Sequence, residues 1–151
     1  MSLPLDNLVK ISKGGLKAEP PSQSEIDGLL RSATRKLLDA RIPSLGLESA
    51  FDLAYNAAHA LALAALRWHG YRAENRYLVF QALPHTVGFA ATQWRVLDFC
   101  HNKRNLAEYE GSFNVDQKLV NDLLAVTQEL EILVVALGPV SSQNKASQSP
   151  K

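Results

Sequence analysis

The residues best suited to chemistry lie in one segment, His101 to Tyr109, which reads HNKRNLAEY. Successive residues of a helix turn by about 100°. A helix here would therefore place His101, Arg104, Asn105 and Glu108 on one side, with Tyr109 at its margin. A guanidinium can offer two parallel hydrogen bonds to a phosphate, and an imidazole can exchange a proton near neutral pH. We predict an anion-binding surface built from these five residues.

Each of these residues also has a purely structural interpretation. Arg104 can form an ion pair with Glu108 one turn later, and His101 can be a core histidine whose ring nitrogens are satisfied within the fold. Asn105 can satisfy a buried carbonyl, and the Tyr109 hydroxyl can bond a backbone carbonyl at the end of a helix. The sequence leaves both interpretations open.

An earlier segment adds three polar residues on one helical face, Asp52, Asn56 and His59. They either extend the polar surface around Arg104 or form a solvent face or a dimer contact. The four histidines of the chain show no metal-ligand spacing, and the single Cys100 excludes a disulfide framework. We expect no metal and no cofactor.

The helices that must position these residues follow from apolar positions that recur every three or four residues. Ser22 and Glu25 form a capping-box pattern at the first helix, and Gly70 is a C-terminal stop for the second. The expected ranges are 22–42, 47–69, a short helix over 74–83, 86–109 and 115–137. No segment alternates as a strand does, so we predict an all-α fold, an antiparallel four-helix up-and-down bundle with one extra short helix and no sheet.

Length and composition indicate one globular domain, with 151 residues, 46% hydrophobic and 21% charged. We expect an N-terminal arm over 1–21, the bundle over 22–138 and a disordered tail over 139–151. No apolar stretch approaches the roughly 20 residues of a membrane span, and the first residues do not resemble a secretory signal. A cytoplasmic protein with no membrane partner is the expectation.

The charge is unevenly placed along the chain. Residues 67–104 contain six cationic and two acidic side chains, whereas residues 105–138 contain six acidic side chains and one lysine. Such asymmetry marks an anion-facing surface in some proteins. The alternative is that basic and acidic helices complement each other within the fold.

Three stretches of the sequence together resemble the HEPN superfamily (higher eukaryotes and prokaryotes nucleotide-binding domains): FDLAYNAAHALALAALRWHGYR, RYLVFQALPHT and HNKRNLAEYEG. The similarity covers about residues 51–137 and lies in the helix order, the Tyr55-Asn56 pair and the Arg104-Asn105 step. The resemblance implies a helical bundle that commonly dimerises. It also implies a metal-independent ribonuclease of the toxin–antitoxin type, frequently beside a nucleotidyltransferase-type antitoxin partner.

The catalytic signature of that family is an arginine, a polar residue directly after it and then a histidine, with four to six residues between the arginine and the histidine. Arg104 and Asn105 match its first two positions, but Tyr109 stands where the shortest form has histidine. A tyrosine with a pKa near 10 is a poor general base at neutral pH. His101, one turn before Arg104, would have to supply the imidazole from the other side.

Three functions therefore stay open. The first is a dimeric component of a toxin–antitoxin-type system that binds a nucleotide, RNA or a partner protein without strong catalysis. The second is a metal-independent ribonuclease with a composite dimer site, in which Arg104 stabilises the phosphate and His101 or Tyr109 moves the proton. The third is a structural helical dimer. We expect a homodimer that buries the part of the long helix containing Trp94 and His101.

Overall fold

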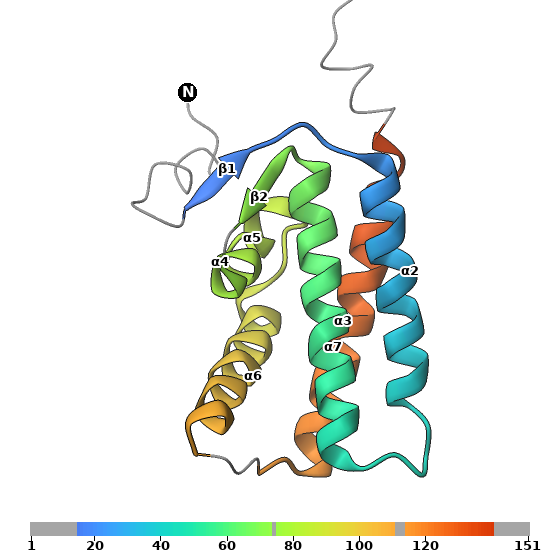
Figure 1. Cartoon of the computed structure of the whole chain (residues 1–151), viewed down its shortest axis with the longest axis vertical. Helices are drawn as coiled ribbons and strands as arrows, with labels where there is room; N and C mark the ends of the chain where they lie inside the picture. Colours follow the sequence, from blue (N-terminus) through green and yellow to red (C-terminus); the bar gives the residue numbers. More distant parts are fainter. Residues whose placement is uncertain (1–14, 74, 111–113, 141–151) are drawn as a thin grey trace, which may run out of the picture.

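The computed structural model describes residues 15–73, 75–110 and 114–140, and the side chains of all of these except residues 108–110. The described part contains four long helices, α2 (Gln23–Ala40), α3 (Leu47–Trp68), α6 (Ala91–Glu110) and α7 (Gln117–Val135). Two short helices, α4 (Arg76–Gln81) and α5 (Leu83–Thr86), lie between α3 and α6 (Figure 1). The all-α class is confirmed. No helix in the described ranges is both long and apolar enough to span a bilayer.

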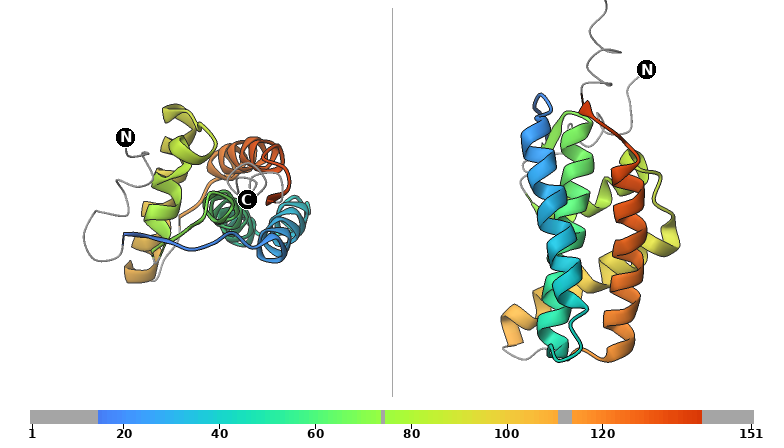
Figure 2. Two further views of the ribbon diagram at one scale, coloured as in Figure 1. Left: turned by 90° about the horizontal axis from the view of Figure 1, so that it is seen from above. Right: turned by 90° about the vertical axis from the view of Figure 1, so that its right-hand side faces the viewer.

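The helix α3 occupies the centre of the fold. Seen from above, α2 and α7 lie on one side of it and α4 and α6 on the other (Figure 2). Ten of the residues that α3 buries are small or aromatic: Ala50, Phe51, Ala54, Tyr55, Ala57, Ala58, Ala60, Ala62, Ala64 and Ala65. Because alanine side chains are short, neighbouring helices can approach α3 closely, which explains how one helix is covered on several faces.

The expectation that no sheet would form is wrong. The strands β1 (Leu16–Ala18) and β2 (Tyr71–Ala73) pair antiparallel, with Leu16 opposite Ala73. Strands of three residues are too short to show an alternating pattern in the sequence. Leu16 is 2% exposed, so the last residues of the expected arm belong to the fold. Residues 1–14 of that arm lie outside the described residues.

Arg67, at the end of α3, binds the segment that joins β1 to α2. Its side chain is 1% exposed and donates hydrogen bonds to the carboxylate of Glu25 and to the backbone carbonyls of Glu19 and Pro20. Arg72 adds ion pairs to the same two glutamates, each at 2.8 Å. The capping-box pattern predicts a hydrogen bond between Ser22 and Glu25, and the Ser22 hydroxyl does accept one from the backbone N–H of Glu25. The Glu25 carboxylate, however, binds arginines from β2 and α3.

Several helix boundaries differ from the expected ones. Thr86 does not begin the long helix, because it ends α5 and is buried, and α6 begins only at Ala91. Pro84 lies in the first turn of α5, where its missing N–H removes no helical hydrogen bond. Asn75 caps α4, and Asp116, not Asn114, caps α7. Short polar side chains compete for such positions, so the periodicity locates a helix better than its first residue.

The C-terminal end of the described chain is docked onto the bundle. Val140 is 2% exposed, and its N–H donates to Oε1 of Gln23 at 2.6 Å. Just before it, the Gly138 carbonyl accepts a hydrogen bond from the Trp68 indole. The expected disordered tail therefore does not begin at residue 139, and its remainder, residues 141–151, lies outside the described residues.

Replacing Arg67 tests how much the fold depends on this residue. We expect Arg67→Met to lower the free energy of unfolding by about 2–4 kcal/mol, because the carbonyls of Glu19 and Pro20 lose their hydrogen bonds from Arg67 and the Glu25 carboxylate loses one of its two arginines. The control is Arg72→Met, whose side chain is 36% exposed and whose loss should cost no more than about 1 kcal/mol. Urea unfolding measures both. Equal losses would contradict the special role of Arg67.

Truncation after Val140 tests the end of the domain. We expect removal of residues 141–151 to change Tm by less than about 2 °C, since that segment offers almost no apolar surface to bury. Val140→Asp should lower Tm by several degrees because it places a charge in a buried position. Calorimetry compares the two variants, and a large loss on truncation would mean that the tail docks.

Candidate functional site

The predicted site residue His101 lies at the junction of α3, α4 and α6. It is 9% exposed, and its Nδ1 lies 2.9 Å from the hydroxyl of Tyr55 on α3. Its Nε2 lies 3.1 Å from the side-chain nitrogen of Asn105, one turn later on α6. Because the Asn105 amide donates, Nε2 accepts, and Nδ1 carries the proton that is donated to Tyr55. Both ring nitrogens of His101 are thus bonded within the fold.

Two guanidinium groups flank the same tyrosine ring. The central carbon of Arg104 lies 5.5 Å from the centroid of the Tyr55 ring, and that of Arg76 lies 6.0 Å from it. Arg104 forms an ion pair with Asp52 on α3, and Arg76 donates to Oδ1 of Asn56 at 3.4 Å. A guanidinium has five N–H donors, so neither contact exhausts its capacity.

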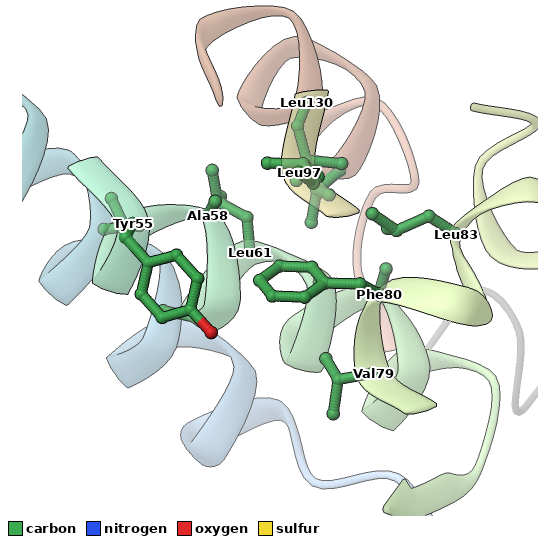
Figure 3. Close-up of a cluster of buried hydrophobic side chains, with 14 of the residues drawn as sticks. Tyr55, Ala58, Leu61, Val79, Phe80, Leu83, Leu97 and Leu130 are labelled. Atoms are coloured by element: carbon green, nitrogen blue, oxygen red, sulfur yellow. The ribbon is translucent and has the colours of Figure 1, made fainter. Parts of the chain in front are cut away.

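Aromatic side chains surround the buried side of His101. The rings of Tyr77 and Phe80, both on α4, lie 5.4 Å and 6.2 Å from the imidazole. Trp94 on α6 donates its indole N–H to the Phe80 carbonyl at 2.7 Å and packs edge-on against Tyr77. Figure 3 shows Phe80 and Tyr55 in the hydrophobic cluster that joins α3, α4, α6 and α7. The packing of α4 between α3 and α6 therefore fixes the imidazole.

Burial keeps both histidines of this region in their neutral form near pH 7. Desolvation lowers the pKa of His101, assisted by Arg76 and opposed by the Asp98 carboxylate. Desolvation also lowers the pKa of His59, on the same face of α3 as Tyr55, to about 4, with Arg76 and His101 adding to the effect. The hydroxyl of Tyr55 stays protonated, because burial raises its pKa.

The structure brings together three of the five predicted site residues. His101, Arg104 and Asn105 share one cluster, whereas the side chains of Glu108 and Tyr109 lie outside the described residues. Arg104 has its described ion pair with Asp52 on a neighbouring helix. The core interpretation of His101 is confirmed, because both of its ring nitrogens are bonded within the fold, and its part in an anion site stays a prediction.

Arg76 is not among the site residues that we predicted from the sequence, and α3 contributes more polar side chains to the site than we expected. The face with Asp52, Asn56 and His59 does extend the polar surface, because Asp52 contacts Arg104 and Asn56 contacts Arg76. These three residues are therefore not simply a solvent-exposed face of α3, as one of our expectations had it. Arg76 stands two residues before three consecutive apolar residues, Leu78 to Phe80, which α4 buries. The sequence around Arg76 could therefore indicate a short buried helix, but it does not indicate which side of α3 that helix covers.

Three of the six cationic side chains in residues 67–104 form ion pairs with acids that come earlier in the chain. Arg67 and Arg72 pair with Glu19 and Glu25, and Arg104 pairs with Asp52. These ion pairs do not match the expected complementarity with the acidic segment 105–138, because their acidic partners all precede residue 67. The anion-facing surface stays a prediction. Arg76 is exposed, and it donates a hydrogen bond to Asn56 on α3.

Metal and thiol chemistry find no support in the part of the chain that the structure describes. Within those ranges, no three histidine, cysteine, aspartate or glutamate side chains could hold a metal ion. Cys100 is fully buried, and burial raises the pKa of its thiol to about 12. A thiol in that state is a poor nucleophile.

Comparison of the chain with protein-family models, with curated proteins and with solved structures gave no significant match.

The depressed histidine pKa values predict how stability depends on pH. Between pH 6.5 and about 4 the unfolded chain takes up a proton on His59 that the folded chain does not. The free energy of unfolding should therefore fall as pH falls through this window. We expect His59→Gln to weaken this dependence, with His101 retaining part of it. Urea titrations at pH 5.0 and 6.5 measure the slope, and a native slope of zero would contradict the assignment.

Proposed function

We propose that the α3–α4–α6 cluster binds the phosphate group of a nucleotide or of RNA without strong catalysis. The observation that carries this proposal is the placement of Arg76 and Arg104 around one tyrosine ring, beside a neutral histidine and an asparagine amide. Arginine is suited to phosphate because its planar donors match two phosphate oxygens at once. Arg76 is exposed and Arg104 is 28% exposed, so both can meet a ligand from solvent.

The bonding of His101 favours binding over turnover. A general base needs a free nitrogen within hydrogen-bond reach of the proton that it removes. Here Nδ1 is bonded to Tyr55 and Nε2 to Asn105. A ribonuclease reaction through His101 would require the Asn105 amide to move aside. The metal-independent ribonuclease with a composite dimer site is therefore the alternative.

The resemblance to HEPN proteins extends this proposal to a biological class. The residues that carry the resemblance, Tyr55-Asn56 and Arg104-Asn105, are the residues that meet in this cluster. We propose on that basis a component of a toxin–antitoxin-type system, with a nucleotidyltransferase-type protein as its partner. Dimerisation through the Trp94–His101 part of α6 stays a prediction, although α3 and α4 already cover His101 within one chain.

Titration of RNA and mononucleotides into matched variants tests the anion site. We expect Arg76→Gln and Arg104→Gln each to weaken binding by about tenfold or more, because each removes a charge-assisted pair of hydrogen bonds. Arg95→Gln is the control, since it removes the same charge from an exposed position of α6. Higher salt should weaken binding to the native protein.

The products of the RNA incubation separate binding from catalysis. Binding without a 2′,3′-cyclic phosphate product supports the proposal, and such a product that disappears in Arg104→Gln supports the ribonuclease. Equal binding by the native, Arg76→Gln and Arg104→Gln proteins would exclude the anion site and leave the structural dimer.

A further inference from the structure

A cavity of about 220 Å³ lies where the start of α2 meets the ends of α3 and α7, and we call it the α2–α3–α7 cavity. Figure 1 shows the described C-terminal end, in red, beside the start of α2. The walls are mostly aliphatic and come from all three helices and the turn after α7: Ile26, Leu30, Ala64, Val134, Val135 and Leu137. Such walls suit the apolar part of a ligand.

Hydrogen bonds hold the polar groups of this cavity in place. The Trp68 indole, which lines the cavity, donates to the Gly138 carbonyl at 3.0 Å. Gln23 accepts a hydrogen bond from the Val140 N–H at 2.6 Å and donates one to Oδ1 of Asp27 at 2.7 Å. The indole, the amide and the carboxylate are thus ordered before a ligand enters, which reduces the entropy that binding costs.

Asp27 supplies the charge of the cavity wall. None of the described residues that line the cavity is cationic. In the described ranges the Asp27 carboxylate forms no ion pair, not even with Arg31 one turn later on α2. Because the Gln23 amide bonds Oδ1, the second oxygen is left as an acceptor. A carboxylate beside apolar walls, without a cation of the chain, favours a ligand that brings a positive charge.

The helix ends around the cavity have the same preference. α3 ends at Trp68 and α7 at Val135, so two C-terminal ends, which carry partial negative charge, border the cavity. The start of α2 has the opposite polarity, and the Asp27 carboxylate offsets it. An indole is also the aromatic group that attracts cations most strongly. The cavity is therefore suited to an ammonium group.

The volume limits the size of the ligand. An apolar protein cavity of about 150 Å³ holds one benzene molecule, whereas drug-sized ligands occupy roughly 300–1,000 Å³. A cavity of about 220 Å³ has room for one aromatic ring or a short alkyl chain with one polar group. Val135, in its wall, is 58% exposed, so the cavity opens to solvent on that side.

We infer that the α2–α3–α7 cavity binds a small organic monoamine in its ammonium form. The apolar part of the amine packs against Leu30 and Val134, and the ammonium group donates to the Asp27 carboxylate. The residues that α3 contributes, Ala64 and Trp68, lie more than two helical turns beyond Tyr55. This site is therefore separate from the α3–α4–α6 cluster and does not depend on anion binding there.

Two compounds of the same shape test the need for a positive charge. 2-Phenylethylamine and 2-phenylethanol share a ring and an ethyl arm, and they differ in their polar group, which is an ammonium group or a hydroxyl at pH 7. We expect calorimetric titration of the native protein to give the amine a Kd at least about tenfold lower than that of the alcohol. Higher salt should weaken the amine only.

A matched pair of variants tests the assignment to Asp27. Asp27→Asn keeps the acceptor for Gln23, so circular dichroism should show it folded, and it should weaken amine binding about tenfold or more while affecting the alcohol less than about twofold. Asp39→Asn removes the same charge from an exposed position of α2 outside the cavity and should leave both affinities unchanged. Amine binding that is equal in the native protein and Asp27→Asn would overturn the inference.

The Trp68 indole N–H reports where the amine binds. The chain has two tryptophans, so a ¹H–¹⁵N spectrum contains two indole signals. We expect 2-phenylethylamine to shift the signal of Trp68 and to leave that of Trp94 unchanged. A shift confined to Trp94 would contradict the site. Equal affinities for the amine and the alcohol, or no saturable binding of the amine up to about 10 mM, would also overturn the inference.

Discussion

The central position of α3 is the constraint on which the other elements depend. A helix with neighbours on several faces cannot carry a long polar stripe or many large side chains, because both would hold those neighbours away. Its alanines allow close approach, and its few large buried residues, Phe51, Tyr55, Leu61 and Leu66, fill the gaps between them. The chain therefore packs α2 and α7 on one part of α3 and leaves another part to α4 and α6.

The same constraint explains why polar chemistry concentrates where it does. On the side of α3 that α4 and α6 cover, the aromatic ring of Tyr55 is buried together with its polar hydroxyl. A buried hydroxyl needs a hydrogen-bond partner, and here the partner is the imidazole of His101. That contact fixes α6 against α3 at one point. The guanidinium groups of Arg76 and Arg104 then cover the Tyr55 ring from helices that α3 has brought together. An anion site at this junction would thus be preorganised by packing.

Arg67 is a third arginine on this part of the fold, and its role is structural. It stands where α3 ends and the chain turns into β2, and it is 1% exposed. Its donors reach backbone carbonyls of the segment that leads into α2, so it joins the N-terminal strand, α2 and α3 in one network. Burial by itself acts to raise the pKa of Glu25, but the bonds from Arg67 and Arg72 outweigh it, and the pKa lies below its ordinary value. Arg67 and Arg72 therefore stabilise the fold, whereas the Arg76 side chain is exposed to solvent.

The sequence alone determined the all-α class, the location of the long helices and the common face of His101, Arg104 and Asn105. These properties follow from the period of one helix, which is local. The tertiary structure decided which residues meet those three. Tyr55 and His101 are 46 positions apart, and Arg104 and Asp52 are 52 positions apart. The pairing of β1 with β2 and the contact of Arg76 with Tyr55 depend likewise on how helices pack, because no local period records which face of α3 receives which neighbour.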